Sequence, residues 1–173
     1  MFRRRMTGGA ILLSKCLLRR MQEERSSHLP LETGGFLLGL RRGLHIEITE
    51  ATLEGPQDRS TRRSFERRDP GHAKLAVAAW EAGDGKVGLV GDWHSHPVGS
   101  PMPSAADRGA WLTLAQNLKS AAVGIILADS QAPGVFLSQP RRLVMRPFQL
   151  KLVEETRDEL VYARRDQAPF LVG

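Results

Sequence analysis

The chain has 173 residues, of which 41% are hydrophobic, and it carries a formal net charge of +6. This length and composition suit one core, so we expect a single domain over residues 1–173, with its core at about 10–147 and the tail 148–173 unassigned. A lone cysteine excludes a disulfide framework and a cysteine-rich structural zinc site, and no segment has the roughly 20 apolar residues that span a membrane, so we expect a cytoplasmic protein without membrane partners.

The chain begins with arginines and an apolar run, as a signal peptide does. Ser14 and Lys15 interrupt that run, however, and no small-residue cleavage site follows. The spacing of the apolar residues instead predicts an amphipathic helix over residues 10–27, ending before Pro30. Residues 34–53 then alternate like a hairpin that turns at 41–43.

Residues 55–71 are polar and basic and contain both Gly-Pro and Pro-Gly, so we expect a long loop there. The elements that follow it are a helix at 72–83, a buried strand at 86–94, a helix at 104–120, and strands at 121–128 and 134–140. In the tail, 148–153 alternates like a strand and 154–165 suits a helix, and the assignment stays open. Strands mixed with helices indicate an α/β or α+β fold.

His94 and His96 stand at the end of the buried strand. Alternate residues of a strand point to the same face, so both imidazoles can reach one point, and Pro97 favours an extended His96. The two histidines are half of a metal site. The pair alone is equally consistent with a surface accident or with hydrogen-bonded core histidines.

Asp107 lies in the first turn of the helix that Ser104 caps. Taken alone, the S-x-x-D pattern is better explained by a capping box, in which Asp107 bonds the Ser104 backbone. Two imidazoles and one carboxylate together are nevertheless a ligand set typical of catalytic zinc, with the fourth position left for water.

A water activated in this way needs a base that is not itself a ligand. Glu32 is the candidate, because it stands at the entrance of a strand beside the flexible Gly34-Gly35 pair. A surface glutamate is the alternative interpretation.

Together these residues resemble a known family. His94-Ser-His-Pro, six further residues, Ser104-Ala-Ala-Asp and the upstream glutamate in ETGGFLLG are similar to the JAMM motif of the MPN (JAB) metalloproteases. Most of residues 10–140 resembles the prokaryotic JAB proteins found in mobile-element and antiphage operons beside ubiquitin-like proteins and their activating enzymes.

The resemblance implies an MPN/JAB fold, similar to that of cytidine deaminases, with a curved mixed β-sheet flanked by helices. It also implies that His94, His96 and Asp107 bind one zinc per chain. Glu32 would be the general base, and Ser104 would hydrogen-bond the oxyanion or the activated water.

The function implied is a zinc isopeptidase that cleaves after the C-terminal glycine of a ubiquitin-like protein or its conjugate. Activating or conjugating enzymes of the same operon would be further partners. One alternative is a JAB hydrolase that removes a terminal amino acid such as cysteine from a sulfur-carrier protein, although the long basic segment 56–70 offers surface for a folded substrate. Another is a non-catalytic MPN scaffold, which has no chemical need for the five site residues together. A third is a nucleic-acid-associated protein, which the positive charge suggests; no nucleic-acid motif or aromatic interleaving accompanies that charge, so we do not expect a nucleic-acid partner.

Other residues are assigned structural roles. Trp93 is expected in the core, Ser95 on the strand face opposite the histidines, and Cys16 among the leucines of the first helix. Asp92 shares the histidines' face and could orient an imidazole, though an ordinary strand-end carboxylate explains it as well. Surface or capping positions are expected for the remaining histidines, His28, His45 and His72.

Overall fold

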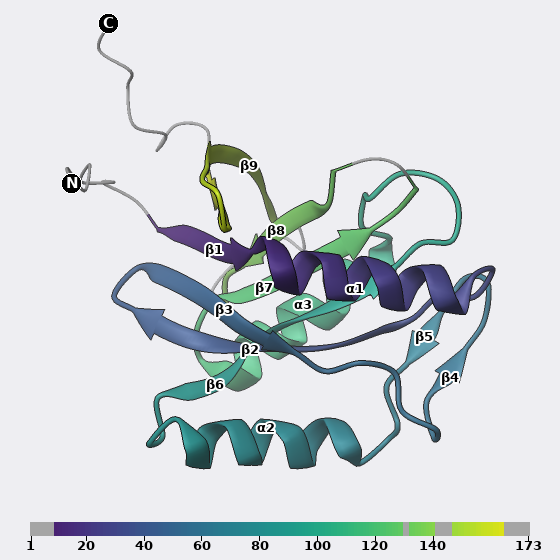
Figure 1. Ribbon diagram of the computed structural model, residues 1–173, viewed down its shortest axis with the longest axis horizontal. Helices are drawn as coiled ribbons and strands as arrows, with labels where there is room; N and C mark the ends of the chain where they lie inside the picture. Colours follow the sequence, from purple (N-terminus) through teal and green to yellow (C-terminus); the bar gives the residue numbers. More distant parts are fainter. Residues whose placement is uncertain (1–8, 130–131, 141–146, 165–173) are drawn as a thin grey trace, which may run out of the picture.

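The chain folds around a curved sheet of mixed strand direction. The computed structural model describes residues 9–129, 132–140 and 147–164. The strands of the sheet are β1 (Ala10–Ser14), β2 (Gly34–Arg42), β3 (His45–Ala51), β6 (Val87–Ser95), β7 (Ala122–Leu127), β8 (Gly134–Ser138), β9 (Phe148–Glu155) and β10 (Glu159–Ala163). The helices are α1 (Lys15–His28), α2 (Gly71–Ala82) and α3 (Ala105–Leu118). The strands run in the order β1-β10-β9-β8-β7-β6-β2-β3, and β1 pairs with β3 to close the sheet into a barrel (Figure 1).

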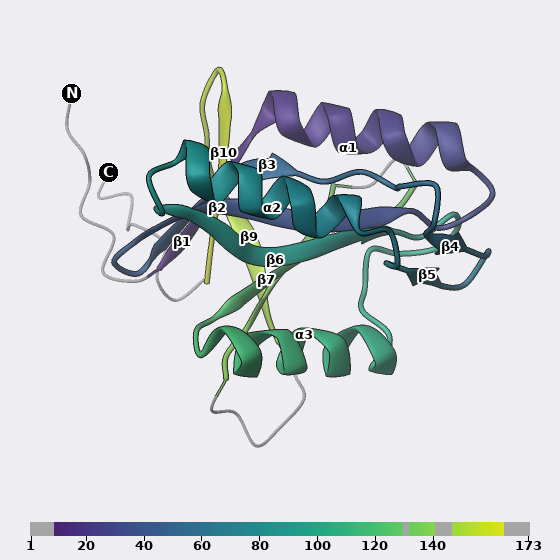
Figure 2. The ribbon, with the colours of Figure 1, turned by 90° about the horizontal axis from the view of Figure 1, so that it is seen from below.

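Both parallel and antiparallel neighbours occur in this barrel. β1 with β3 and β6 with β7 are parallel, and the other pairs are antiparallel. α2 packs against β2 and β6, and α3 packs against β7 and β8. Figure 2 shows α1 and α3 on opposite sides of the sheet. The predicted α/β class with a curved mixed sheet is confirmed. Within the described residues, no helix combines the length and the apolar character needed to cross a membrane.

The first element is a strand, whereas we expected a helix from residue 10 onward. Ala10, Ile11 and Leu13 are buried, and β1 is hydrogen-bonded between β10 and β3. Ser14 ends this strand and caps α1, where its Oγ accepts from the Leu17 backbone N–H (3.2 Å). The helix prediction was wrong for residues 10–14 because pairing on both sides of β1 outweighs their helical spacing.

Helix α1 packs against the hydrophobic core of the barrel. Its Leu17, Leu18 and Met21 are buried in one cluster with Trp93, which is fully buried as expected. Cys16 is exposed, so its expected place in the core was wrong. With about 100° between successive residues of a helix, Cys16 lies on the side of α1 opposite these leucines.

The tail contributes two strands to the barrel. β9 agrees with the alternating pattern of residues 148–153. Residues 159–163, within the segment that suited a helix, form β10, in which Ala163 pairs with Ala10 and Glu159 with Ser14. Because β10 is hydrogen-bonded to both β1 and β9, tertiary pairing overrides the local helical pattern.

The basic segment 55–71, expected as a loop, contains a short hairpin of β4 (Arg59–Ser60) and β5 (Phe65–Glu66). Asp58 holds both ends of the segment. Its carboxylate accepts hydrogen bonds from the backbone N–H groups of Gly55 (2.7 Å), Arg68 (2.6 Å) and Asp69 (2.7 Å). A fourth bond joins its Oδ2 to His72 Nε2 (2.7 Å).

His72 therefore has a structural role that its isolation in the sequence did not suggest. Its side chain is 3% exposed, and its Nδ1 lies 2.6 Å from the Thr52 hydroxyl. The expectation of a surface or capping histidine was wrong here, because the partners of His72 come from distant loops. His28, at the end of α1, does bond a helix carbonyl, that of Glu24 (2.9 Å).

Asp58 gives a test of how the hairpin segment is held. Burial alone would raise the pKa of Asp58, but the hydrogen bonds from Asp69, Gly55, His72 and Arg68 lower it to about 2. A lowered pKa means that this stabilisation is present above about pH 4 and is lost as the pH falls toward 2. We expect Asp58→Asn to reduce the free energy of unfolding by roughly 2 kcal/mol at pH 7, because an amide cannot accept on both sides.

Urea denaturation followed by circular dichroism between pH 7 and pH 2 measures this effect. The variant should lose less stability than the parent across the acid range. Asp84→Asn, at an exposed turn with positive φ, is the matched control and should follow the parent curve. Parallel curves for Asp58→Asn and the parent would contradict the assignment.

Candidate active site

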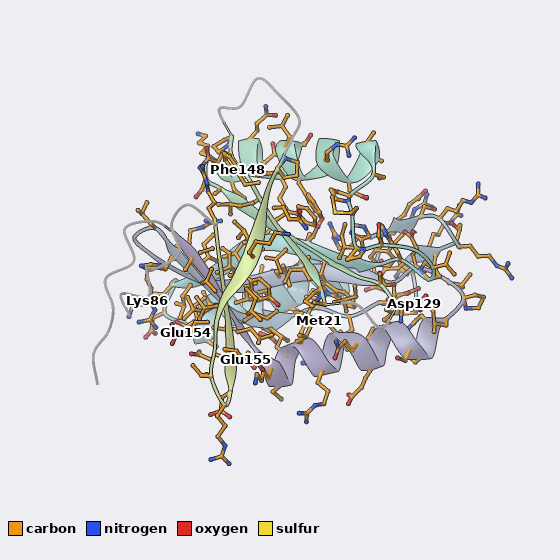
Figure 3. All side chains as sticks on the ribbon, turned by 90° about the horizontal axis from the view of Figure 1, so that it is seen from above. Met21, Lys86, Asp129, Phe148, Glu154 and Glu155 are labelled. Atoms are coloured by element: carbon orange, nitrogen blue, oxygen red, sulfur yellow. The ribbon has the colours of Figure 1, made fainter. Side chains whose placement is uncertain are left out.

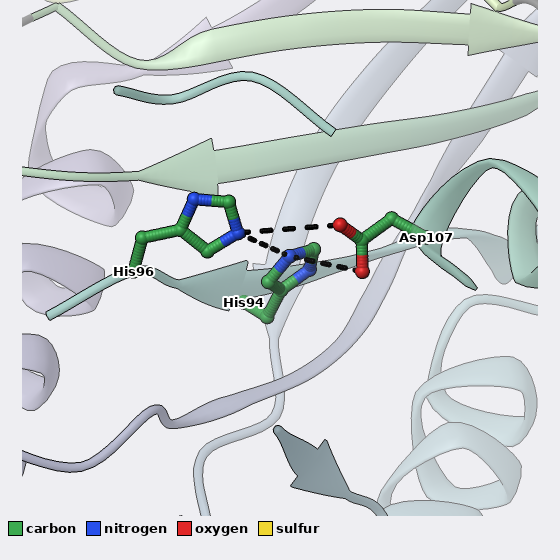
Figure 4. Close-up of side chains that lie close together, drawn as sticks. All are labelled: His94, His96 and Asp107. Atoms are coloured by element: carbon green, nitrogen blue, oxygen red, sulfur yellow. Dashed lines mark hydrogen bonds and ion pairs between the residues drawn. The ribbon is translucent and has the colours of Figure 1, made fainter. Parts of the chain in front are cut away.

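The end of β6 and the start of α3 bring three candidate metal ligands to one point (Figure 4). His94 Nε2 lies 3.3 Å from His96 Nε2 and 3.4 Å from Asp107 Oδ1. His96 Nε2 lies 4.0 Å from Asp107 Oδ2. The three side chains are 12%, 18% and 20% exposed, so the cluster is shielded and still reachable from solvent.

These separations fit a shared zinc ion. Bonds of roughly 2.0–2.2 Å in a tetrahedral arrangement place neighbouring ligand atoms about 3.4 Å apart. One ligand atom from each of the three residues lies within 4.8 Å of the others. Two imidazoles and a carboxylate also match the donor types that zinc takes in catalytic sites. The residues present could therefore hold zinc and leave one position open.

The second ring nitrogen of His96 fixes its tautomer. His96 Nδ1 lies 3.0 Å from the Ser100 carbonyl oxygen. A carbonyl can only accept, so Nδ1 carries the proton and, in the neutral ring, Nε2 presents its lone pair to the cluster.

Asp107 acts both as a helix cap and as a member of the cluster. The Ser104 backbone N–H donates to Asp107 Oδ2 (2.7 Å), and the Asp107 backbone N–H donates to Ser104 Oγ (3.2 Å). The capping box is therefore present, and it directs the carboxylate toward the histidines. Burial alone would raise the pKa of Asp107, but the hydrogen bond and charge of His94, with bonds from Ser104, hold it well below its usual range. Asp107 is a carboxylate at any physiological pH.

The charge of Asp107 acts on His94 in return. Burial lowers the pKa of His94, but the hydrogen bond with Asp107 and the charges of Asp107, Asp92 and Glu32 outweigh it and raise the pKa. The cluster thus attracts positive charge at His94, as a cation site does.

Glu32 is placed beside the cluster by the pairing of β2 with β6. The Ser95 backbone N–H donates to the Thr33 carbonyl (2.8 Å), and the Thr33 backbone N–H donates to Ser95 Oγ (3.0 Å). Gly34 pairs with His94, and a side chain there would overlap the Trp93 carbonyl. Close packing, rather than the flexibility we expected, explains this glycine.

The environment of Glu32 suits a proton acceptor. Burial, the largest effect, raises the pKa of Glu32. The charge of His94 lowers this pKa and the charge of Asp107 raises it, so the pKa of Glu32 is raised overall. Glu32 is 8% exposed. A carboxylate with a raised pKa is a stronger proton acceptor than an ordinary glutamate.

A pocket of about 290 Å³ opens over the cluster. Glu32 and Ser104 line it together with the three candidate ligands, so all five predicted site residues meet there. Arg63, Ser64 and Phe65 of the β4–β5 hairpin form part of its wall. The backbone N–H of Glu32 also donates to the Thr61 carbonyl (2.8 Å), which attaches the hairpin to the candidate base.

Asp92 has partners other than the imidazole we considered. Its Oδ1 accepts from Trp111 Nε1 (2.5 Å), and its Oδ2 accepts from Arg67 Nη2 (3.2 Å). The Arg67 guanidinium lies 4.2 Å from the centroid of the Phe36 ring. Asp92 therefore joins α3 to the segment after β5, across the strand that carries His94.

Sequence reasoning missed Trp111, Arg67 and Arg25 as supports of the site. Arg25 is 9% exposed and donates to the carbonyls of His96 and Pro97. The sequence did contain an indication that Arg25 is buried, because Arg25 follows Met21 by four residues and so lies on the same side of the helix. Ser95, as expected, lies on the opposite face from the histidines and is fully buried.

A family model agrees with this site. The model described as prokaryotic homologs of the JAB domain matches residues 14–142. The chain belongs to this family. The match includes Glu32, both histidines, Ser104 and Asp107, so the predicted resemblance to the JAB/MPN proteins is confirmed.

Curated relatives of this JAB-domain chain share part of its length. A Pseudomonas aeruginosa protein named CD-NTase/cGAS isopeptidase is 40% identical over 90 residues, which are 52% of this chain and 57% of that protein. A Vibrio cholerae protein of the same name is 32% identical over 101 residues, 58% of this chain and 65% of that protein. The chain thus matches about three fifths of the length of these relatives.

One solved structure shares the fold of this chain. A solution structure of a protein from Desulfitobacterium hafniense superimposes with a TM-score of 0.56 at 24% identity, over 75% of this chain and 84% of that one. At this identity the likeness concerns the fold alone.

Asp107→Asn separates the metal cluster from the helix cap. The asparagine oxygen can still accept from the Ser104 backbone, so α3 should begin at the same residue, but a neutral amide is a poor zinc ligand. We expect the melting temperature of metal-free protein to change little and zinc affinity to fall at least tenfold. Titration of metal-free protein against a chelating dye measures the affinity. Equal zinc affinity in the parent and the variant would remove Asp107 from the ligand set.

Proposed function

We propose that this chain is a zinc-dependent isopeptidase of the JAMM type, with one zinc held by His94, His96 and Asp107. The single observation that carries the proposal is the convergence of these three donors with Glu32 and Ser104 on one pocket. The family match and the isopeptidase names of the relatives support it.

Bound zinc would supply a more acidic water and a polarised carbonyl. Glu32 would take the proton at its carboxylate and return it to the leaving amine, a task that its raised pKa suits. Ser104 Oγ would donate its proton toward the oxygen on which negative charge develops, while it accepts from the Asp107 backbone N–H.

The proposed substrate is a conjugate in which a C-terminal glycine of a ubiquitin-like protein is joined to a lysine. The names of the relatives suggest that a CD-NTase takes part in the conjugate. We place the enzyme in the cytoplasm and in a bacterial antiphage system, in keeping with the operons of the JAB proteins that it resembles. Activating or conjugating enzymes of that system would be its further partners.

The decisive experiment is incubation of zinc-loaded protein with a purified CD-NTase conjugate, followed by mass spectrometry of both released ends. Release of an intact C-terminal glycine and a free lysine amine is the expected result. Removal of one terminal amino acid instead would indicate the sulfur-carrier type of hydrolase. No cleavage by the metal-loaded protein would favour a scaffold.

Glu32→Gln tests the role of the base. The variant should fold, bind one zinc per chain and lose at least a hundredfold in kcat, because it lacks the proton acceptor but keeps the three ligands. Elemental analysis gives the zinc content, and a conjugate-cleavage assay gives kcat. Loss of zinc from this variant would make Glu32 a ligand and refute its assignment as the base.

The β4–β5 hairpin is the proposed docking site for the folded part of the substrate. Its basic residues differ in their contacts: Arg67 pairs with Asp92 and Arg68 with Glu66, whereas Arg59, Arg62 and Arg63 are exposed and have no ion pair among the described residues. Arg59 and Arg62 can therefore meet an acidic surface without breaking an ion pair, and, unlike Arg63, neither of them lines the pocket.

Reversing the charge of Arg59 and Arg62 to glutamate should raise KM for a protein conjugate about tenfold and leave hydrolysis of a short tail peptide nearly unchanged, because neither residue lines the pocket in which a short peptide would bind. Arg20→Glu on the exposed side of α1 is the matched control. A similar loss on both substrates would mean that the hairpin supports the site rather than docks the substrate.

A further inference from the structure

Arg25 is an unusual residue on the inner side of α1. The other buried positions of this helix are Leu17, Leu18 and Met21, which pack into the core. Arg25 occupies the next turn of the same face and is only 9% exposed. A buried guanidinium is costly unless its N–H groups are paired, so its contacts indicate what the position requires.

The guanidinium donates to the backbone that follows the last strand residue of β6. Arg25 Nε and Nη2 each lie 3.3 Å from the His96 carbonyl oxygen, and Nη2 lies 3.1 Å from that of Pro97. Nη2 also forms an ion pair with Asp129 Oδ1 at 2.9 Å. Figure 3 shows Asp129 beside the C-terminal half of α1, and Met21 between α1 and the sheet.

These contacts fall where regular sheet bonding ends. The backbone N–H of His96 still donates to the Leu127 carbonyl (2.7 Å), but β6 ends at Ser95. The carbonyls of His96 and Pro97 point toward α1 and receive charged donors there. The backbone N–H of His96 is therefore held by β7, and its carbonyl is held by Arg25.

The direction of the His96 ring depends on this backbone. Its Nδ1 is directed to the Ser100 carbonyl, three residues beyond Pro97, so the turn and the ring are coupled. A rotation of the His96–Pro97 peptide would move Nε2 away from His94 and Asp107. Groups that orient a metal ligand in this way typically change metal affinity 10- to 100-fold when removed.

We propose that Arg25 is a positioning residue for the metal centre: by holding the carbonyls of His96 and Pro97, it sets the direction of His96 Nε2 and with it the affinity for zinc. This inference rests on the zinc site of the proposed function. Asp129 contributes by keeping the guanidinium oriented, and its own side chain is 60% exposed.

The test compares zinc affinity with stability in the full chain. Arg25→Gln should bind zinc 10- to 100-fold more weakly than the parent in competition with a chelating dye. Arg25→Lys should recover part of the affinity, since an ammonium can bond a carbonyl but lacks the planar fork. The cobalt-substituted protein adds a geometric readout, and the intensity of its visible absorption bands should change in Arg25→Gln. Arg20→Gln, on the exposed side of the same helix, should match the parent in every measurement.

The outcomes separate the two proposals. If the parent protein binds no zinc, the proposed function fails at that step and the role of Arg25 fails with it. If the parent binds zinc and Arg25→Gln binds it equally well with an unchanged cobalt spectrum, only the positioning role is refuted, whatever its melting temperature.

A second variant covers the case in which Arg25→Gln does not fold. Asp129→Asn leaves the guanidinium in place and removes only its charged partner, so it should weaken zinc binding severalfold and keep the fold. Unchanged zinc affinity in both Asp129→Asn and Arg25→Lys would overturn the proposal.

Discussion

The two hydrogen bonds between Thr33 and Ser95 determine where the candidate site forms. They fix the register of β2 against β6 at the end where both the glutamate and the histidines emerge. A shift of one residue would turn His94 toward the core and Trp93 toward the pocket, because neighbouring strand residues face opposite sides. The raised pKa of Glu32 and the position of the hairpin above it both depend on this register.

The site could be predicted because its parts are local. Two histidines separated by one residue share a strand face whatever the surrounding fold is, and a capping serine fixes the first turn that carries Asp107. The residues that hold the site in place could not be predicted in the same way, because their contacts are distant in the sequence. Arg25 and Asp129 are separated by 104 positions in the chain, and Trp111 reaches Asp92 from another element. Side-chain bonds of that kind leave no periodic signal in a single sequence.

The secondary structure could not be predicted at two segments that are partners of each other: residues 10–14 were wrongly expected to be helical, and the assignment of residues 159–163 stayed open. Residues 10–14 and 159–163 form β1 and β10, and each has a local pattern that suits a helix. Their strand conformation results from pairing across nearly the whole chain, and such pairing is not visible in a short window. The wrong start of the first helix did not change which of its residues are buried, because α1 begins directly after its cap Ser14 and keeps the expected helical spacing.

The β1–β10 seam also affects how the protein is made. β1 can pair with β3 as soon as residue 51 has left the ribosome, but its other edge has to wait for β10, which ends at Ala163. At about 5–20 residues per second, that edge stays unpaired for roughly 5–20 seconds of synthesis. An open strand edge is a template for pairing with other chains. Nascent chains of this protein thus pass through an aggregation-prone stage that ends only when the barrel closes.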